Sequence, residues 1–113
     1  SVVAGAGDDT ISGGAGDDFI FAGEGDDIIV AGTGVDTVTG GAGADVFDFN
    51  HISESTSAAR DTIRDFSAAA GDIIDLSGID ANSAIGDVDG NGSIDLNILL
   101  LGVTSMGLGD FVL

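Results

Sequence analysis

Large apolar residues recur at every ninth position over the first half of the chain. Each stands in the middle of a three-residue segment between glycine-rich stretches, and the five are Ile11, Ile20, Ile29, Val38 and Phe47. Side chains alternate between the two faces of a strand, so such a segment predicts a short strand with one side chain toward a core. A fixed period of nine indicates an internal repeat, whose units bury their apolar residues by stacking.

Five gapless copies follow from this alignment: AGAGDDTIS (4–12), GGAGDDFIF (13–21), AGEGDDIIV (22–30), AGTGVDTVT (31–39) and GGAGADVFD (40–48). Positions 2 and 4 are always glycine, position 6 is always aspartate and position 8 is always large and apolar. Glycine permits positive φ and close backbone approach, so positions 1 to 6 predict a turn. Two copies then form one coil of about 18 residues, and successive coils pair as parallel strands in two facing sheets. The predicted fold class is all-β.

The position-6 aspartates supply negative charge for a hard cation that prefers oxygen ligands, and they are Asp9, Asp18, Asp27, Asp36 and Asp45. The whole chain has a net charge of −18, with Arg60 and Arg64 as its only Lys or Arg residues, yet it is 43% hydrophobic. This balance excludes nucleic acid and anionic membranes as partners and disfavours simple disorder. No apolar run is long enough for membrane insertion, and no cysteine is present for disulfides.

The repeat resembles the G-G-x-G-x-D-x-U-x nonapeptide of the RTX (repeats-in-toxin) family, which implies a right-handed parallel β-roll with Ca²⁺ as its cofactor. The resemblance implies about three ions, each between two loops on the same side, with the pairs Asp9/Asp27, Asp18/Asp36 and Asp27/Asp45. It also implies backbone carbonyl ligands from positions 1 to 4: Ala4, Gly5, Ala6, Gly7, Gly13, Gly14, Ala15, Gly16, Ala22, Gly23, Glu24, Gly25, Ala31, Gly32, Thr33, Gly34, Gly40, Gly41, Ala42 and Gly43.

Positions 5, 7 and 9 vary between the copies. Position 5 is acidic in three copies (Asp8, Asp17, Asp26) and apolar in two (Val35, Ala44), and we expect it to point to solvent as surplus charge. Positions 7 and 9 must face outward if position 8 faces inward. Two copies carry apolar pairs there, Phe19/Phe21 and Ile28/Val30. We expect at least one of these pairs to be covered, by the C-terminal region or by a preceding domain.

Beyond the repeats, residues 49–113 predict a separate C-terminal β region, a short antiparallel cap, with strands at 60–66, 71–79 and 93–101. The motifs VFDF, RDTIRDF, GDIIDLS and the terminal DFVL resemble the C-terminal domain of the serralysin family of secreted zinc metallopeptidases. That resemblance implies an extracellular location and export by a type I ABC transporter that reads Asp110–Leu113. Ser1–Val3 fits positions 7–9 of an earlier copy, so we expect a larger protein with an N-terminal domain. The alternative is a carbohydrate-binding RTX module of another secreted enzyme.

Further candidate sites lie after the repeats. Asp61 and Asp65 are candidates for an extra ion at the end of the roll, the alternative being ion pairs with Arg60 and Arg64. The segment Asp87–Asp95 resembles an EF-hand loop but has isoleucine where a bidentate acid is needed, which favours a plain hairpin turn. His51 is expected in a loop. No HExxH, GxSxG or cysteine nucleophile occurs, so we assign no catalytic residue.

Overall fold

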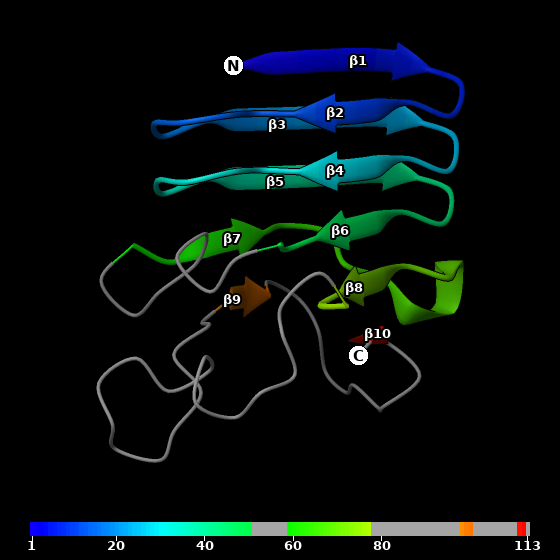
Figure 1. Cartoon of the computed structure of the whole chain (residues 1–113). Helices are drawn as coiled ribbons and strands as arrows, with labels where there is room; N and C mark the ends of the chain where they lie inside the picture. The colour runs from blue at the N-terminus through cyan, green and yellow to red at the C-terminus, as the bar shows by residue number, and fades with distance from the viewer. Residues whose placement is uncertain (51–58, 78–97, 101–110, 113) are drawn as a thin grey trace.

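The computed structural model describes residues 1–50, 59–77, 98–100 and 111–112. Its strands form two sheets of five, which lie face to face (Figure 1). The first sheet runs in the order β1 (Val2–Ala6), β3 (Phe19–Glu24), β5 (Thr37–Ala42), β7 (Asp61–Ile63), β9 (Ile98–Leu100). The second runs β2 (Thr10–Ser12), β4 (Ile28–Val30), β6 (Val46–Asp48), β8 (Ile73–Asp75), β10 (Phe111–Val112).

The chain alternates between the sheets, so each coil contributes one strand to each of them. Every described strand pair is parallel, and equivalent residues of successive coils lie side by side, such as Ile11 beside Ile29 and Ile20 beside Val38. The predicted β-roll is therefore confirmed. The strands of the first sheet are longer than predicted, because β3 and β5 each continue into the following loop.

Position 8 fills the space between the sheets. All five residues of this column are buried, with exposed fractions of 2–5%, and Ile63 and Ile74 continue the column below them. Burying a side chain of this size stabilises a fold by about 1.5–3 kcal/mol. The core is nevertheless one side chain thick, since Ala22 and Ala31 are the other buried apolar residues at the level of the third and fourth repeats.

The antiparallel cap is wrong for the described strands, because the roll continues past the last repeat. In β7, Thr62 pairs with Thr37 and Ile63 with Val38; in β8, Ile73 pairs with Val46. Both strands repeat the Asp-x-Ile spacing of positions 6 to 8, which lets them join the parallel ladders. The domain boundary at residue 48 stays a prediction, and both sheets cross it.

Phenylalanines close the lower part of this core. Phe49 and Phe66 are buried, and the ring centroids of Phe47 and Phe66 lie 6.0 Å apart at an interplanar angle of 45°. Phe66 lies in the loop between β7 and β8, which includes a 3-10 helix at Ala68–Ala70 and ends at Gly71 with a φ of 101°. This loop replaces the glycine-rich turn of the repeats.

The outer faces are more apolar than expected. Phe19, Phe21 and Ile28 have exposed fractions of 65%, 50% and 43%, and Val30 is half-buried. Neither pair is buried by the described residues, so the covering of at least one pair, by the C-terminal region or by a preceding domain, stays a prediction. His51, the EF-hand-like segment Asp87–Asp95 and most of the strand predicted at 93–101 fall outside the described residues. No helix in the described part could cross a membrane.

Candidate calcium-binding loops

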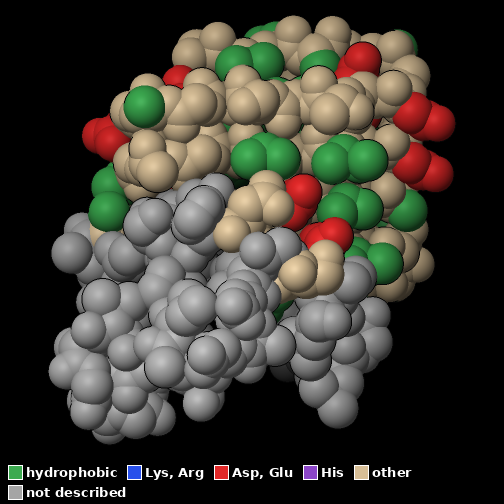
Figure 2. All heavy atoms as spheres, in the orientation of Figure 1, with side chains coloured by type: hydrophobic (Ala, Val, Ile, Leu, Met, Phe, Trp, Pro, Cys, Tyr) green, Lys and Arg blue, Asp and Glu red, His purple; other side chains and the backbone are tan. Residues whose placement is uncertain are grey.

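The predicted ligand residues lie in the turns between the strands, and the turns stack in two columns at opposite edges of the roll (Figure 1). One column holds loops 4–9, 22–27 and 40–45; the other holds loops 13–18 and 31–36. Figure 2 shows acidic side chains at both edges and others on the face between them. In each column we call the loop nearer the N-terminus the upper loop of a pair.

Glycine at positions 2 and 4 is required by both backbone angle and space. All ten of these glycines have φ between 97° and 136°. A Cβ on Gly23 would lie 1.8 Å from the carbonyl oxygen of Gly5, and a Cβ on Gly25 would lie 2.4 Å from that of Gly7. The position-2 and position-4 carbonyls of an upper loop therefore point at the loop below, which is where the predicted ions would need them.

Backbone hydrogen bonds already link the loops of each pair. The N–H of Gly7 donates to the carbonyl of Glu24 at 2.7 Å, and the N–H of Thr33 donates to the carbonyl of Gly14 at 2.9 Å. Each carbonyl oxygen has two lone pairs, so one such bond leaves capacity for a cation. The predicted carbonyl ligands are thus brought together loop against loop.

The position-6 aspartates form a continuous ladder down each column. One carboxylate oxygen, Oδ1, accepts the backbone N–H of the position-6 residue in the loop above. The N–H of Asp9 donates to Asp27 at 2.8 Å, that of Asp18 to Asp36 at 2.8 Å, and that of Asp27 to Asp45 at 3.1 Å. These are the three pairs predicted to share an ion.

The second carboxylate oxygen of these aspartates is buried without a hydrogen-bond donor in the described part of the chain. The Oδ2 atoms of Asp9, Asp18, Asp27 and Asp45 are buried and have no hydrogen-bond partner among the described residues. Asp27, Asp36 and Asp45 have exposed fractions of 0%. A buried carboxylate oxygen without a donor costs several kcal/mol, whereas Ca²⁺ takes such oxygens as ligands. The donor set therefore fits a hard divalent cation.

The raised pKa of Asp45 also reflects the cost of burying a carboxylate. Burial raises it from 3.8 to about 6; the N–H of Asp27 opposes the rise, and the carboxylates of Asp72, Asp27 and Asp65 add to it. No group of three or more His, Cys, Asp or Glu side chains gathers as a metal site in the described part. Each gap between loops offers two aspartates, so carbonyl oxygens must complete any six-coordinate site.

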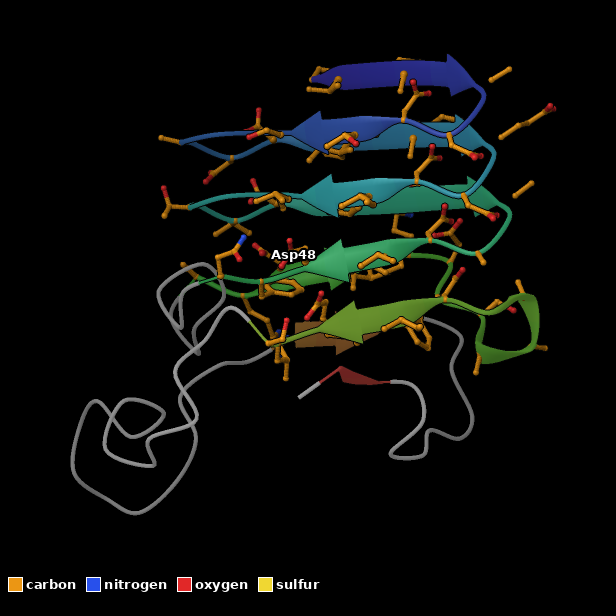
Figure 3. All side chains as sticks on the ribbon, turned by 45° about the vertical axis from the view of Figure 1, so that its right-hand side comes forward. Asp48 is labelled. Carbon is orange, nitrogen blue, oxygen red and sulfur yellow. The ribbon has the colours of Figure 1, made fainter. Side chains whose placement is uncertain are left out.

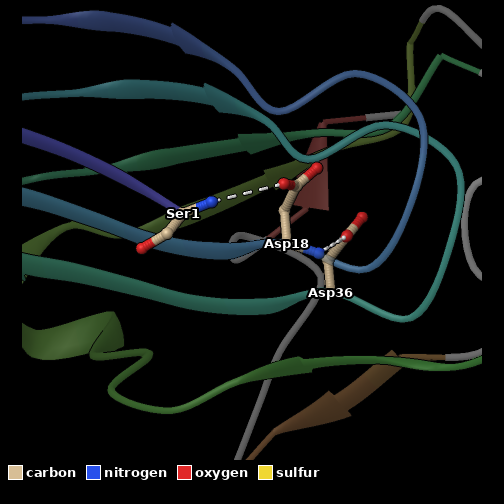
Figure 4. A network of polar contacts seen from close by, with 3 residues as sticks. All are labelled: Ser1, Asp18 and Asp36. Atoms are coloured by element: carbon tan, nitrogen blue, oxygen red, sulfur yellow. Dashed lines mark hydrogen bonds and ion pairs between the residues drawn. The ribbon is translucent and has the colours of Figure 1, made fainter.

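The Ser1 amino group lies beside the first aspartate of the second column (Figure 4). Asp18 is the first position-6 aspartate there, and the Ser1 amino group lies 3.6 Å from its Oδ1. Below it, the N–H of Asp18 donates to Asp36. The amino group thus lies beside the oxygen that, in the lower loops, accepts a backbone N–H.

Position 5 is exposed in the first four copies, as predicted, and half-buried at Ala44, and its aspartates also bind the neighbouring loop. Asp8 accepts the N–H of Asp26, Asp17 that of Val35, and Asp26 that of Ala44, each at 2.8 Å. The prediction of mere surplus charge is wrong in this respect. These bonds run from the lower loop to the upper aspartate, opposite to those of position 6.

Two aspartates beyond the repeats extend the ladders. Asp61 accepts the N–H of Asp36 at 2.9 Å and Asp72 accepts that of Asp45 at 2.9 Å. Asp61 had been predicted; Asp72 was missed, although its spacing to Ile74 matches positions 6 to 8 of the repeat. The separations of 25 and 27 residues, instead of 18, hid this continuation.

Asp65 and Asp72 close the column with hydrogen bonds. Asp65 accepts the N–H groups of Gly40 and Gly41 at 2.9 and 2.7 Å. The second oxygen of Asp72 accepts the N–H of Ser67 at 2.8 Å. Burial raises the pKa of Asp72, its hydrogen bonds from Asp45 and Ser67 lower it, and the Asp65 charge raises it. Asp65 thus binds backbone rather than either arginine, and both its oxygens have donors.

One further acidic pair lies on the outer face of the second sheet. Asp48 of β6 (labelled in Figure 3) is the register partner of Asp75 of β8. Partial burial raises the pKa of Asp48, the charge of Asp75 raises it further, and a hydrogen bond with Asn50 lowers it. Asp75 in turn accepts the N–H and hydroxyl of Ser77 at 2.9 and 2.6 Å. This pair is separate from the loop columns.

Comparison with known proteins agrees with the geometry of the loops. Residues 1–29 and 21–50 match the family model described as "RTX calcium-binding nonapeptide repeat (4 copies)". Among solved structures, the chain is similar to the solution structure of the AlgE6R3 subunit from the Azotobacter vinelandii mannuronan C5-epimerase. The identity is 29%, the TM-score 0.42, and the match covers 65% of this chain and 47% of that one. No curated protein sequence matches the chain.

The parallel coils and the glycine–aspartate loops between them define a parallel β-roll. Its first 50 residues are similar to the RTX calcium-binding nonapeptide repeats. Proteins with these repeats are typically secreted. The chain spans about half the length of the epimerase subunit to which it is similar.

Proposed function

We propose that this chain is a Ca²⁺-dependent folding and export module, and that about three ions bind between the loop pairs Asp9/Asp27, Asp18/Asp36 and Asp27/Asp45. One observation carries this proposal: the buried Oδ2 atoms of Asp9, Asp18, Asp27 and Asp45 lack donors among the described residues. Between the same loops, glycine carbonyls of the upper loop point at the glycines of the lower loop. Burial of such oxygens is favourable only with a counter-charge.

The chain's own residues would make folding depend on the ion. Aspartates stacked 18 residues apart repel one another, and a core one side chain thick offsets little of that repulsion. Bound calcium supplies positive charge and fills the open ligand positions. Because the paired loops exist only in the folded roll, the free energy of binding becomes free energy of folding. Extracellular calcium modules have Kd values of about 10⁻⁴ to 10⁻³ M, so such a chain stays unfolded at cytosolic calcium levels.

The test is a calcium titration of the full chain, with far-UV circular dichroism as the readout. The β signal should be low in excess chelator and should rise cooperatively in millimolar Ca²⁺. Mg²⁺ should substitute poorly, since it demands tight octahedral geometry and retains its waters. A β signal of equal size in chelator and in calcium would contradict the proposal. A calorimetric titration would give the number of bound ions.

For the parent protein, we propose a secreted serralysin-like metallopeptidase with a further N-terminal domain, because the motifs RDTIRDF and GDIIDLS resemble that family. The export machinery would read the terminal Asp110–Leu113, of which the structure describes Phe111–Val112 in β10. Removing residues 110–113 should abolish export by a type I transporter and leave calcium binding intact. Unchanged export would reject this role. Finding HExxHxxGxxH upstream of Ser1 would support the metallopeptidase.

A second candidate function is carbohydrate binding on the outer face of the first sheet. An open depression of about 170 Å³ there is lined by residues that include Phe19, Phe21, Thr37, Thr39 and Arg64. Aromatic rings, hydroxyl groups and a guanidinium are common contacts for acidic sugars. Calcium-loaded protein should then bind a uronic-acid polymer, and Arg64→Ala should weaken that binding. Absence of binding by the loaded roll would remove this candidate.

A further inference from the structure

The position-5 aspartates mark which loops lie above another regular loop. Asp8, Asp17 and Asp26 stand in the three upper loops, and each accepts an N–H from the loop below. The residue in the lower loop donates its backbone N–H, so its side chain does not matter, and the donors include Val35 and Ala44. The two copies that lack an acid are those with no further regular repeat below them.

Ala44 shows why an acid would be useless in the last copy. In register, the residue below Ala44 is Gly71, because Asp45 lies above Asp72. The N–H of Gly71 already donates to the carbonyl of Ala68 at 3.1 Å. An aspartate at position 44 would therefore find no free donor at Gly71, the residue that lies below it.

Each position-5 bond also fixes a peptide group that bears a predicted calcium ligand. The N–H of Asp26 and the carbonyl of Gly25 belong to one planar, trans peptide unit. Asp8 holds that N–H from above. The Gly25 carbonyl therefore points downward, where a Cβ on Gly43 would lie 2.1 Å from its oxygen. Asp8 thus aims a carbonyl into the gap between Asp27 and Asp45.

Between two stacked loops the position-5 and position-6 bonds run in opposite directions. Asp9 donates downward to Asp27, and Asp26 donates upward to Asp8. Together the two bonds fix both the spacing and the lateral offset of the loops. The position-5 bond is exposed and leaves the position-6 Oδ2 atoms open for a cation.

We infer that Asp8, Asp17 and Asp26 are positioning residues that hold the calcium loops in register through their hydrogen-bond acceptors, and not calcium ligands or mere surplus charge. This inference rests on the proposed calcium function. It assigns the role to the acceptor oxygen, so an uncharged acceptor should serve as well as a carboxylate.

Two triple variants separate the acceptor from the charge. Asp8→Asn/Asp17→Asn/Asp26→Asn and Asp8→Ala/Asp17→Ala/Asp26→Ala remove the same three negative charges, and only the first keeps an oxygen that accepts the N–H. The asparagine variant should keep its calcium midpoint within about twofold of the parent chain. The alanine variant should need about fivefold more calcium, the order expected for three lost hydrogen bonds. Calorimetry should give the parent ion count for the asparagine variant.

Ala44→Asp is the matched gain-of-acid control. It adds a carboxylate at position 5 above the already bonded N–H of Gly71, so its midpoint should stay within about twofold of the parent value. Equal shifts of the two triple variants, failure of both to fold, or no shift in either would overturn the inference. A marked fall in the midpoint of Ala44→Asp would overturn it too. A parent chain whose fold ignores calcium would instead reject the proposed function.

Discussion

The regular loop 40–45 and the closing loop 65–72 lie against each other, yet they satisfy their aspartates in different ways. In the regular loop, Asp45 has one oxygen without a described donor, and its pKa is raised to about 6. In the closing loop, Asp65 binds two N–H groups and Asp72 binds two more. Both loops enter a strand with the same Asp-x-apolar sequence.

The difference shows that the aspartate alone does not define a calcium loop. Two glycines at positive φ aim carbonyls at the next turn in the regular loops, whereas a 3-10 helix brings the Ser67 N–H to Asp72 in the closing loop. A backbone N–H supplies the partial positive charge that a cation would otherwise supply. The closing loop can therefore end the column without an ion of its own.

The largest difference between the regular loops and the closing loop should appear when a glycine of each is replaced by alanine, in the variants Gly23→Ala and Gly71→Ala. Both glycines have positive φ, at 120° and 101°, which costs an alanine about 1–2 kcal/mol. At Gly23 the new Cβ would also lie 1.8 Å from the Gly5 carbonyl, whereas at Gly71 its nearest neighbour is the Ala44 side chain at 3.1 Å. Gly23→Ala should abolish calcium-induced folding, and Gly71→Ala should remain foldable with a lower melting temperature.

Gly5→Ala is the control for backbone angle, because its φ is 128° and nothing lies within 4 Å of its Cβ position. Circular dichroism at saturating calcium measures all three variants. Similar losses in Gly23→Ala and Gly5→Ala would show that backbone angle, and not the close approach of stacked loops, sets the requirement.

Asp27 and Asp9 should differ because they border different numbers of gaps. Asp27 accepts the N–H of Asp9 and donates its own to Asp45, so it faces two predicted ions, whereas Asp9 faces one. Asp27→Ala should raise the calcium midpoint by about tenfold and Asp9→Ala by about threefold, since each lost ligand weakens coupled binding and folding. Calorimetric ion counts should fall more for Asp27→Ala. An equal or reversed order would contradict ion sharing between loops.

Asp72→Asn should destabilise the closing loop without removing an ion. One oxygen can still accept the N–H of Asp45, but the amide NH₂ would then face the N–H of Ser67. The expected cost is about 1–3 kcal/mol in urea unfolding at saturating calcium. Asp48→Asn is the matched control on the outer face, where removing repulsion from Asp75 should be neutral or slightly stabilising. A lower ion count for Asp72→Asn would show that this loop also binds calcium.

The smallest effect should appear with pH in the absence of calcium. A carboxyl whose pKa is higher in the folded state destabilises that state when ionised. Asp45 has a folded pKa of about 6 against 3.8, so its penalty is full above pH 6 and declines as the pH falls toward 4. Residual β structure in chelator should therefore increase between pH 7 and pH 5, and Asp45→Asn should flatten that change. Loss of structure over this window would contradict the assignment.

The sequence predicted the parts of the fold that repeat identically. Ile29 lies in the core, Asp27 in the ladder and Gly23 in the turn because each column has one chemical task in every copy. Position 5 was harder, since its exposed aspartates look like ordinary surface charge. Their acceptor role depends on a backbone N–H that lies 18 residues away.

The continuation of the roll was missed for a related reason. Asp61 and Asp72 occupy position 6, but the segments before them differ in length from a repeat, and an alignment on glycine ends at residue 48. Strand pairing needs only the Asp-x-Ile entry and the inward isoleucine. The loop between two strands can therefore change in length and conformation while the sheet register is kept.

Because one nonapeptide forms half a coil, the sheet in which the roll begins depends on whether the number of copies is even or odd. With the copies present here, β1 lies in the first sheet, on the side of Phe19 and Phe21. Adding or deleting nine residues would begin the roll in the other sheet and turn its N-terminal end by half a revolution about the long axis. Adding or deleting 18 residues would keep the starting sheet and change only the height. Length changes in steps of two repeats therefore preserve the direction in which the chain enters, and single-repeat changes reverse it.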